Sequence, residues 1–268
     1  MFFNYLKTST IKSEEDKELS KEKSRSKYMS APIIRNEQQK ALKYKADTLR
    51  AKDFYKEAVS TYLNSILLDR NNSDTYLGLG ICYKKLGKNK KAIEYLEKAA
   101  LLNPNSFETF YELGLCHLKE GSACCAIKCF IQAIQIEPEN PDAIYQLGLA
   151  HEQCEEADMA LMIYQKLIEN SPNYINAYIR KSSLFMKMEL YKQALGLYLD
   201  VLKINKNYTK IYFDIGVCLD KLGKISDAKR YYRKFLTAQP EAENANIALK
   251  RIEKLRKIKK TTENLSLV

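Results

Sequence analysis

The sequence predicts an all-α protein built from consecutive helix pairs. Apolar and small residues recur every 34 residues over most of the chain. Within each period the apolar positions follow two separate helical spacings rather than the alternation of strands. Glycine and proline are scarce, with nine and six among 268 residues, so long helices are uninterrupted.

An alanine that recurs every 34 residues sets the register of the repeat. Counting this alanine as position 20 divides the chain into six repeats that follow one another without a gap. The repeats are 39–72, 73–106, 107–140, 141–174, 175–208 and 209–242, and their alanines are Ala58, Ala92, Ala126, Ala160, Ala194 and Ala228.

Further positions support this register. Positions 4 and 24 are large and apolar, position 32 is proline in four repeats, and glycine near position 15 marks the turn between the two helices in three. Small residues at positions 8 and 20 allow the two helices of a repeat to cross closely, while the large residues fill the space around the crossing. Position 8 is occupied by Ala46, Gly80, Gly114, Gly148, Ser182 and Gly216.

This pattern closely resembles the tetratricopeptide repeat over residues 39–242. The resemblance implies a right-handed superhelical solenoid of antiparallel helix pairs, and a non-catalytic scaffold or adaptor that binds other proteins. Repeat 5 departs from the pattern with Lys181 at position 7 and Lys206 at position 32. The clearest copy is 73–106, where the matching residues are Tyr76, Leu79, Gly80, Tyr83, Ala92, Leu96, Ala99 and Pro104.

Two specialised forms of the family are not matched. The asparagine ladder of protein O-glycosyltransferases, at position 6, is absent here. The clamp that holds a C-terminal carboxylate in chaperone adaptors begins with Lys43 but is then broken by Asp47 and Gly78. Only 26 residues follow the last repeat, too few for a catalytic domain.

The two ends of the chain differ from the repeats. Residues 1–38 are rich in Lys, Glu and Ser, and we expect them to be largely disordered. Residues 243–268 are expected to form a basic capping helix with a frayed tail, since terminal elements of such arrays cover the exposed core. The apolar stripe of this helix consists of Ala245, Ala248, Ile252, Leu255 and Ile258.

Residues suited to catalysis or metal binding are few. Both histidines, His117 and His151, fall at position 11 and are interpreted as packing residues. Structural zinc sites usually need two Cys pairs at matched spacing, whereas the cysteines here offer one pair. We therefore predict no catalytic residue, no cofactor and no metal site. A soft-metal site at Cys124, Cys125, Cys129 and Cys154 is the less favoured alternative.

The first helices carry the predicted binding surface. In this family positions 2, 5, 9, 12 and 13 face the concave side. An apolar stripe at these positions indicates a surface that another molecule or segment covers. The apolar candidates are Leu77, Ile81, Tyr111, Leu115, Leu118, Tyr145, Leu149, Ile179, Met186, Phe213 and Val217. A basic edge at position 13 consists of Lys85, Lys119, Lys187 and Lys221.

The expected ligand is an amphipathic helix or an extended peptide with apolar anchors and acidic flanks. The alternative is that neighbouring repeats or the N-terminal tail bury the stripe. The net charge of +11 suits anionic partners, but repeats 3 and 4 hold three basic against eleven acidic residues, which opposes a continuous nucleic-acid track.

No apolar run is long enough for a membrane span and no secretory signal is visible, so a cytoplasmic location is expected. The leading prediction is a protein-binding scaffold. A nucleic-acid-associated basic repeat protein, or a regulatory or targeting subunit of an enzyme complex, are the alternatives, and self-association is left open.

Overall fold

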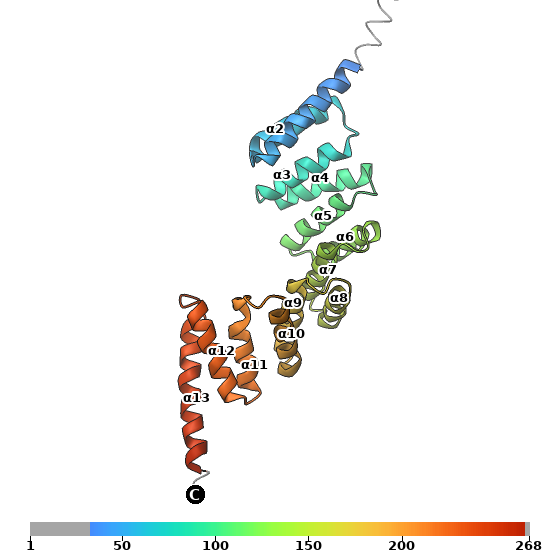
Figure 1. Cartoon of the computed structure of the whole chain (residues 1–268). Helices are drawn as coiled ribbons and strands as arrows, with labels where there is room; N and C mark the ends of the chain where they lie inside the picture. The colour runs from blue at the N-terminus through green and yellow to red at the C-terminus, as the bar shows by residue number, and fades with distance from the viewer. Residues whose placement is uncertain (1–32, 266–268) are drawn as a thin grey trace, which may run out of the picture. The chain divides into compact units, whose positions relative to one another are not determined.

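The computed structural model describes residues 33–265, with side-chain burial described as far as residue 257 (Figure 1). Over that range the chain forms helices joined by short turns and contains no strand, which confirms the predicted all-α class. Most of the segment predicted to be disordered, residues 1–32, lies outside the described residues, as do residues 266–268.

The described residues form two compact units, which divide between Ser122 and Ala123. The described part of the first unit contains a helix over residues 33–51, followed by α2 (Tyr55–Leu68), α3 (Ser73–Lys85), α4 (Asn89–Leu102) and α5 (Phe107–Lys119). Successive helices from α2 to α5 pack against each other, and α3 and α4 form the pair predicted for repeat 2.

The second unit begins with the second helix of repeat 3 and contains the pairs of repeats 4, 5 and 6. Each helix packs on the next one in the chain. Its elements are α6 (Ala123–Ile136), α7 (Pro141–Gln153), α8 (Ala157–Asn170), α9 (Ile175–Lys187), α10 (Tyr191–Ile204), the 3₁₀ turn η1 (Thr209–Ile211), α11 (Tyr212–Lys221), α12 (Ile225–Ala238) and α13 (Ala245–Leu265).

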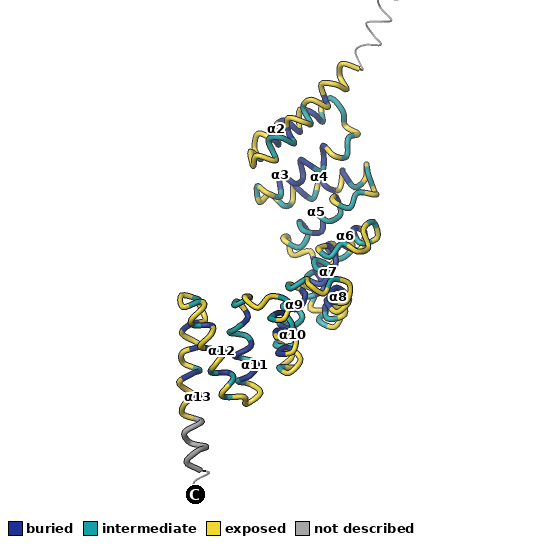
Figure 2. The backbone as a smooth tube through the Cα atoms, in the orientation of Figure 1, coloured by how far each residue is buried: buried dark blue, intermediate teal, exposed yellow. Residues whose placement is uncertain are grey.

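The two helices of a repeat can cross closely because the residues at the crossing are small. All six position-20 alanines are fully buried. A methyl group built on Gly148 of α7 would lie 2.5 Å from Cε1 of Tyr164 on α8, and one on Gly216 would lie 2.7 Å from Cδ1 of Tyr232 on α12. The buried stretches of backbone in Figure 2 lie along the faces that the helices turn toward their neighbours. The predicted reason for small residues at positions 8 and 20 is therefore confirmed in repeats 4 and 6.

Side-chain caps start the first helices of repeats 2, 3 and 4. Each capping oxygen accepts a hydrogen bond from the backbone N–H three residues further on, which satisfies one of the free donors of the helix end. Repeats 5 and 6 have Tyr174 and Tyr208 at the same position and no such bond. Repeat 6 opens with a 3₁₀ turn and α11 has 10 residues, whereas α9 of repeat 5, which lacks the same cap, is a regular α-helix of 13 residues. The capping residues are Asn72, Ser106 and Asn140.

The turn at position 15 has the same backbone conformation in all six repeats. The residue there has a positive φ, between 59° and 79°, whether or not it is glycine. Around Gly87, the N–H of Gly87 bonds to the carbonyl of Lys84 and the N–H of Lys88 to that of Tyr83, which is the Schellman arrangement. The equivalent residues in the other repeats are Asp53, Gly121, Glu155, Glu189 and Gly223.

The outer helices extend the repeat region at both ends. The first helix begins at residue 33, so residues 33–38, placed by the sequence in the polar N-terminal segment, belong to it. Gln39 is buried and its Nε2 donates to Oγ of Ser65 at 3.2 Å. At the other end α13 packs on α12 and buries Ile252 and Leu255.

Replacing Gly87 and Gly196 separately by alanine should change stability in opposite directions. Neither new methyl group would meet an atom within 4 Å. Gly87 has φ +73°, where a side chain costs about 1–2 kcal/mol, so Gly87→Ala should lower the free energy of unfolding by roughly that amount. Gly196 lies inside α10, where alanine is favoured by about 1 kcal/mol, so Gly196→Ala should raise it. Urea unfolding followed by circular dichroism measures both, and equal signs would contradict the turn geometry.

Candidate peptide-binding surface

The predicted apolar residues lie on the first helices of repeats 2 to 6, which are α3 and α5 in the first unit and α7, α9 and α11 in the second. We call this set of eleven residues the first-helix stripe. Ile81 is buried, with 7% of its surface exposed, and the other ten residues are half-buried. The stripe is thus neither fully open to solvent nor fully enclosed in the core.

Members of the stripe at position 5 pack against the second helix of their own repeat. The ring of Tyr145 lies 6.0 Å from the ring of Tyr164, and the ring of Phe213 lies 5.8 Å from that of Tyr232. Such aromatic pairs stabilise the core beyond the area they bury. One side of these position-5 side chains therefore belongs to the helix pair.

Position 9 offers the partly exposed leucines. Leu115 on α5 and Leu149 on α7 are both half-buried, one in each unit. Leucine side chains that remain partly exposed gain free energy when a ligand removes them from water, at about 25 cal/mol per Å². These two leucines are therefore the apolar anchors most suited to direct test.

The predicted basic edge is exposed. Lys85, Lys119, Lys187 and Lys221 fall at the C-terminal residue of α3, α5, α9 and α11. A lysine there is favoured by the negative end of the helix dipole and remains available to an outside anion. The ammonium group of Lys221 lies 5.5 Å from the centre of the Tyr191 ring.

Ion pairs link position 12 of one repeat with position 6 of the next, a feature that the sequence analysis missed. Lys84 on α3 pairs with Glu112 on α5. The polarity is reversed in the second unit, where Glu152 on α7 accepts from Nε of Arg180 on α9 at 3.0 Å and from Nη2 at 2.6 Å. Opposite charges 28 residues apart are the signal that could have revealed these pairs.

Tyrosines at position 24 extend these polar contacts into the repeat. Tyr164 is fully buried, yet its hydroxyl donates to Oε1 of Glu152 at 2.6 Å. Tyr232 donates in the same way to Asp220 at 3.3 Å, and Asp220 also accepts from Arg251 on α13. Burial and the hydrogen bond to a carboxylate together raise the pKa of Tyr164, so this hydroxyl stays protonated as a donor.

Asp214 on α11 occupies position 6 of repeat 6, where Glu112 and Arg180 are paired in repeats 3 and 5. The position-12 residue of the preceding repeat is Met186, which brings no opposite charge. Burial raises the pKa of Asp214 to about 6. Its carboxylate is consequently less favourable in the folded protein than in water.

The histidines lie within the packing as expected. His151 is buried and its Nδ1 lies 2.6 Å from Oε2 of Glu156, while His117 is half-buried, and burial lowers the pKa of His117. Among the described side chains, no three His, Cys, Asp or Glu groups gather in a way that could hold a metal ion.

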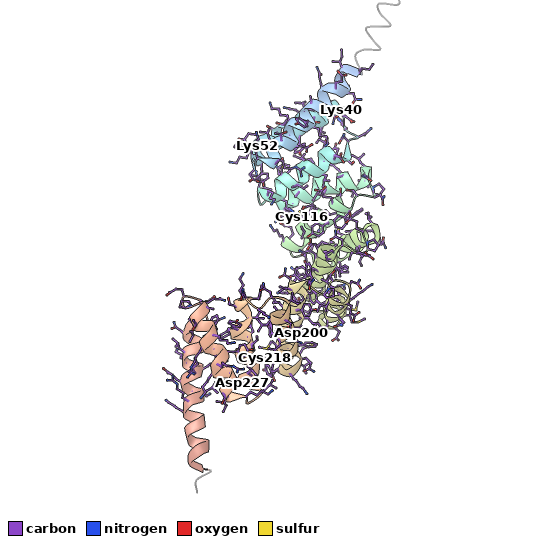
Figure 3. All side chains as sticks on the ribbon, in the orientation of Figure 1. Lys40, Lys52, Cys116, Asp200, Cys218 and Asp227 are labelled. Carbon is purple, nitrogen blue, oxygen red and sulfur yellow. The ribbon has the colours of Figure 1, made fainter. Side chains whose placement is uncertain are left out.

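The position-10 cysteines Cys82, Cys116 and Cys218 are buried and pack as small hydrophobic residues. Figure 3 shows Cys116 on α5 and Cys218 on α11. Burial raises the pKa of the Cys116 thiol to about 11 and that of Cys218 to about 12, so both remain protonated and unreactive at neutral pH.

None of the helices within residues 33–265 has the length and apolar character needed to cross a membrane. A shallow hollow of about 640 Å³ lies between α8 and α9 and is lined by residues that include Met162, Lys181 and Phe185. The members of the first-helix stripe do not line it.

Family models match four stretches of the chain. A tetratricopeptide repeat model matches residues 73–106, and others match residues 142–174 and 209–241. A further TPR repeat model matches residues 125–154. A comparison with curated proteins finds no match.

Solved structures of the same architecture cover most of the repeats. A crystal structure of MamA is 30% identical with a TM-score of 0.58, and the match covers 62% of this chain and 96% of MamA. YrrB, described as a TPR protein with an unusual peptide-binding site, is 19% identical with a TM-score of 0.58 and covers 70% of this chain and 97% of its own. PilW, a type IV pilus biogenesis factor, is 16% identical with a TM-score of 0.66, and the match covers 79% of this chain and 98% of PilW. For YrrB and PilW, the similarity is one of fold alone.

Asp214→Asn should change how stability depends on pH. Because the folded-state pKa of about 6 lies above the ordinary value of 3.8, the folded protein binds more protons than the unfolded chain between these values, and stability falls as pH rises through this window. The Asp214→Asn variant has no carboxyl group at this position, so its stability does not fall in this way. Its free energy of unfolding should match wild type near pH 3, below both pKa values, and exceed it by about 3 kcal/mol above pH 7. Urea titrations across this range measure the difference, and a difference that does not vary with pH would exclude the assignment to Asp214.

Proposed function

The chain belongs to the tetratricopeptide-repeat family, and from this premise we propose that it is a non-catalytic scaffold or adaptor that binds a protein or peptide ligand along the first-helix stripe. The observation that carries the proposal is the half-buried state of the stripe. Ten of its eleven apolar side chains keep some exposed surface although they lie on consecutive first helices. Recurrent exposed apolar surface of this kind usually marks an interaction site.

The chemistry of the surface specifies the ligand. Apolar anchors of an amphipathic helix or extended peptide would cover Leu115 or Leu149, and acidic flanking residues would lie against the exposed lysines of the basic edge. The charge contacts at this edge are open to solvent, so they contribute mainly to the association rate and the choice of partner. Most of the binding free energy would come from the apolar anchors.

Polar substitution of the two leucines tests the proposal. The full chain is first used to retain ligands from native lysate, and a retained protein is then identified, purified and titrated against the variants. Leu115→Asp with Leu149→Asp should weaken binding at least tenfold, because each aspartate places a charge against an apolar anchor. Circular dichroism should show unchanged helix content.

A matched control uses apolar residues outside the stripe. Leu101 on α4 and Met162 on α8 are 84% and 67% exposed, again one in each unit. Leu101→Asp with Met162→Asp should leave the affinity for the same ligand unchanged. Equal losses in the two double variants, or no loss in either, would rule out binding along the stripe. Unfolding of the Leu115 and Leu149 variant would show that these residues belong to the core.

A further inference from the structure

Two cysteines from consecutive repeats meet at the surface of the second unit. Cys124 lies in the first turn of α6, and Cys154 directly follows α7. Their Sγ atoms are 3.8 Å apart and share a hydrogen bond. Cys124 is exposed and Cys154 is half-buried, whereas Cys82, Cys116 and Cys129 are buried.

We propose that Cys124 and Cys154 form a reversible disulfide that joins α6 to α7 when the chain meets a low-molecular-weight disulfide such as oxidised glutathione. A disulfide places the two sulfurs about 2 Å apart, so they must approach by roughly 2 Å from the reduced arrangement. The residues lie at a helix start and just after a helix end, where rotation of the side chains and small backbone shifts can supply this movement. Both thiols are free in the structure, which is the reduced state.

The surroundings favour Cys124 as the first nucleophile. It is the more exposed of the two thiols, so an outside disulfide reaches it first. The neighbouring thiol is better suited to the second step. Burial, the hydrogen bond to Cys124 and the nearby Glu156 raise the pKa of Cys154.

The reaction balances as two successive exchanges. The Cys124 thiolate attacks one sulfur of oxidised glutathione, forming a mixed disulfide and releasing one glutathione thiolate, which takes up a proton. The Cys154 thiol then loses its proton, and its thiolate attacks Sγ of Cys124, displacing the second glutathione. Two protein thiols are oxidised to one disulfide while one glutathione disulfide is reduced to two thiols.

The bond would act on the stacking between repeats 3 and 4. It closes a loop that contains α6, the connection after it and α7, which pack against each other. A cross-link of this kind mainly restricts the unfolded chain. Oxidation should therefore protect this stack from local opening while leaving the helices in place.

The test uses the full chain in buffers of varied ratio of oxidised to reduced glutathione. After alkylation of free thiols, peptide mapping without reductant should show a Cys124–Cys154 linked peptide whose fraction rises with that ratio. The oxidised protein should have a higher melting temperature than the reduced protein, and amide hydrogen exchange in α6 should be slower. Reduction with excess thiol should reverse all three changes.

Cys125 supplies the matched control, since it is exposed and adjacent in sequence to Cys124. Cys125→Ser should retain the linked peptide and the shift in melting temperature, whereas Cys154→Ser should lose both. A predominant link through Cys125, a link formed only between two chains, or no link before the protein unfolds would each overturn the proposal.

Discussion

The close crossing of the two helices in each repeat is the constraint on which the rest of the structure depends. Glycine inside a helix costs about 0.5–1 kcal/mol relative to alanine, yet it stands at position 8 in four of the six repeats. The geometry explains this choice. The Cβ position of Gly148 lies against the ring of Tyr164, and that of Gly80 lies 2.6 Å from Cγ of Leu96. Close contact between the helices therefore outweighs helix propensity at this position.

This crossing determines where the remaining side chains can go. Because the backbones approach closely at position 8, the large residue at position 24 lies across the first helix, and its hydroxyl, where it is tyrosine, can reach that helix's carboxylates. Tyr164 contacts Glu152 in this way, and Glu152 in turn pairs with Arg180 of the next repeat. These contacts form one polar network that connects the packing within a repeat to the stacking between repeats. The same arrangement leaves Leu115 and Leu149 at position 9 at the edge of the core, where both are half-buried.

The sequence alone predicted the elements well, because the spacing of small and apolar residues is a direct consequence of this crossing. Turns between the two helices of a repeat were predicted at Gly87, Gly121 and Gly223, and these residues have positive φ. They could not be predicted at Asp53, Glu155 and Glu189, because there the tertiary packing imposes a conformation that these residues do not favour on their own. The 3₁₀ start of repeat 6 could not be predicted either, because repeat 5 lacks the same side-chain cap and still begins with a regular α-helix.

The surface proposed to bind a ligand was less predictable than the fold. Periodicity correctly assigned the stripe to the first helices, but it could not distinguish a side chain such as Ile81, which is buried, from Leu149, which is half-buried. That difference depends on the neighbouring repeat. Sequence spacing grouped Cys124 and Cys154 with Cys125 and Cys129, but only the packing of α6 on α7 shows which two sulfurs come into contact.

Comparing leucine substitutions at two glycines, each inside a helix of the second unit, tests the central role of the close crossing most directly. Gly148→Leu forces a large side chain against Tyr164 and should lower the free energy of unfolding by at least about 1–3 kcal/mol. Gly196→Leu adds the same side chain to α10 where nothing lies within 4 Å of its Cβ, and should raise the free energy of unfolding by about 0.5–1 kcal/mol. Chemical denaturation of the two variants beside wild type gives both values. Equal effects of the two substitutions would contradict the account.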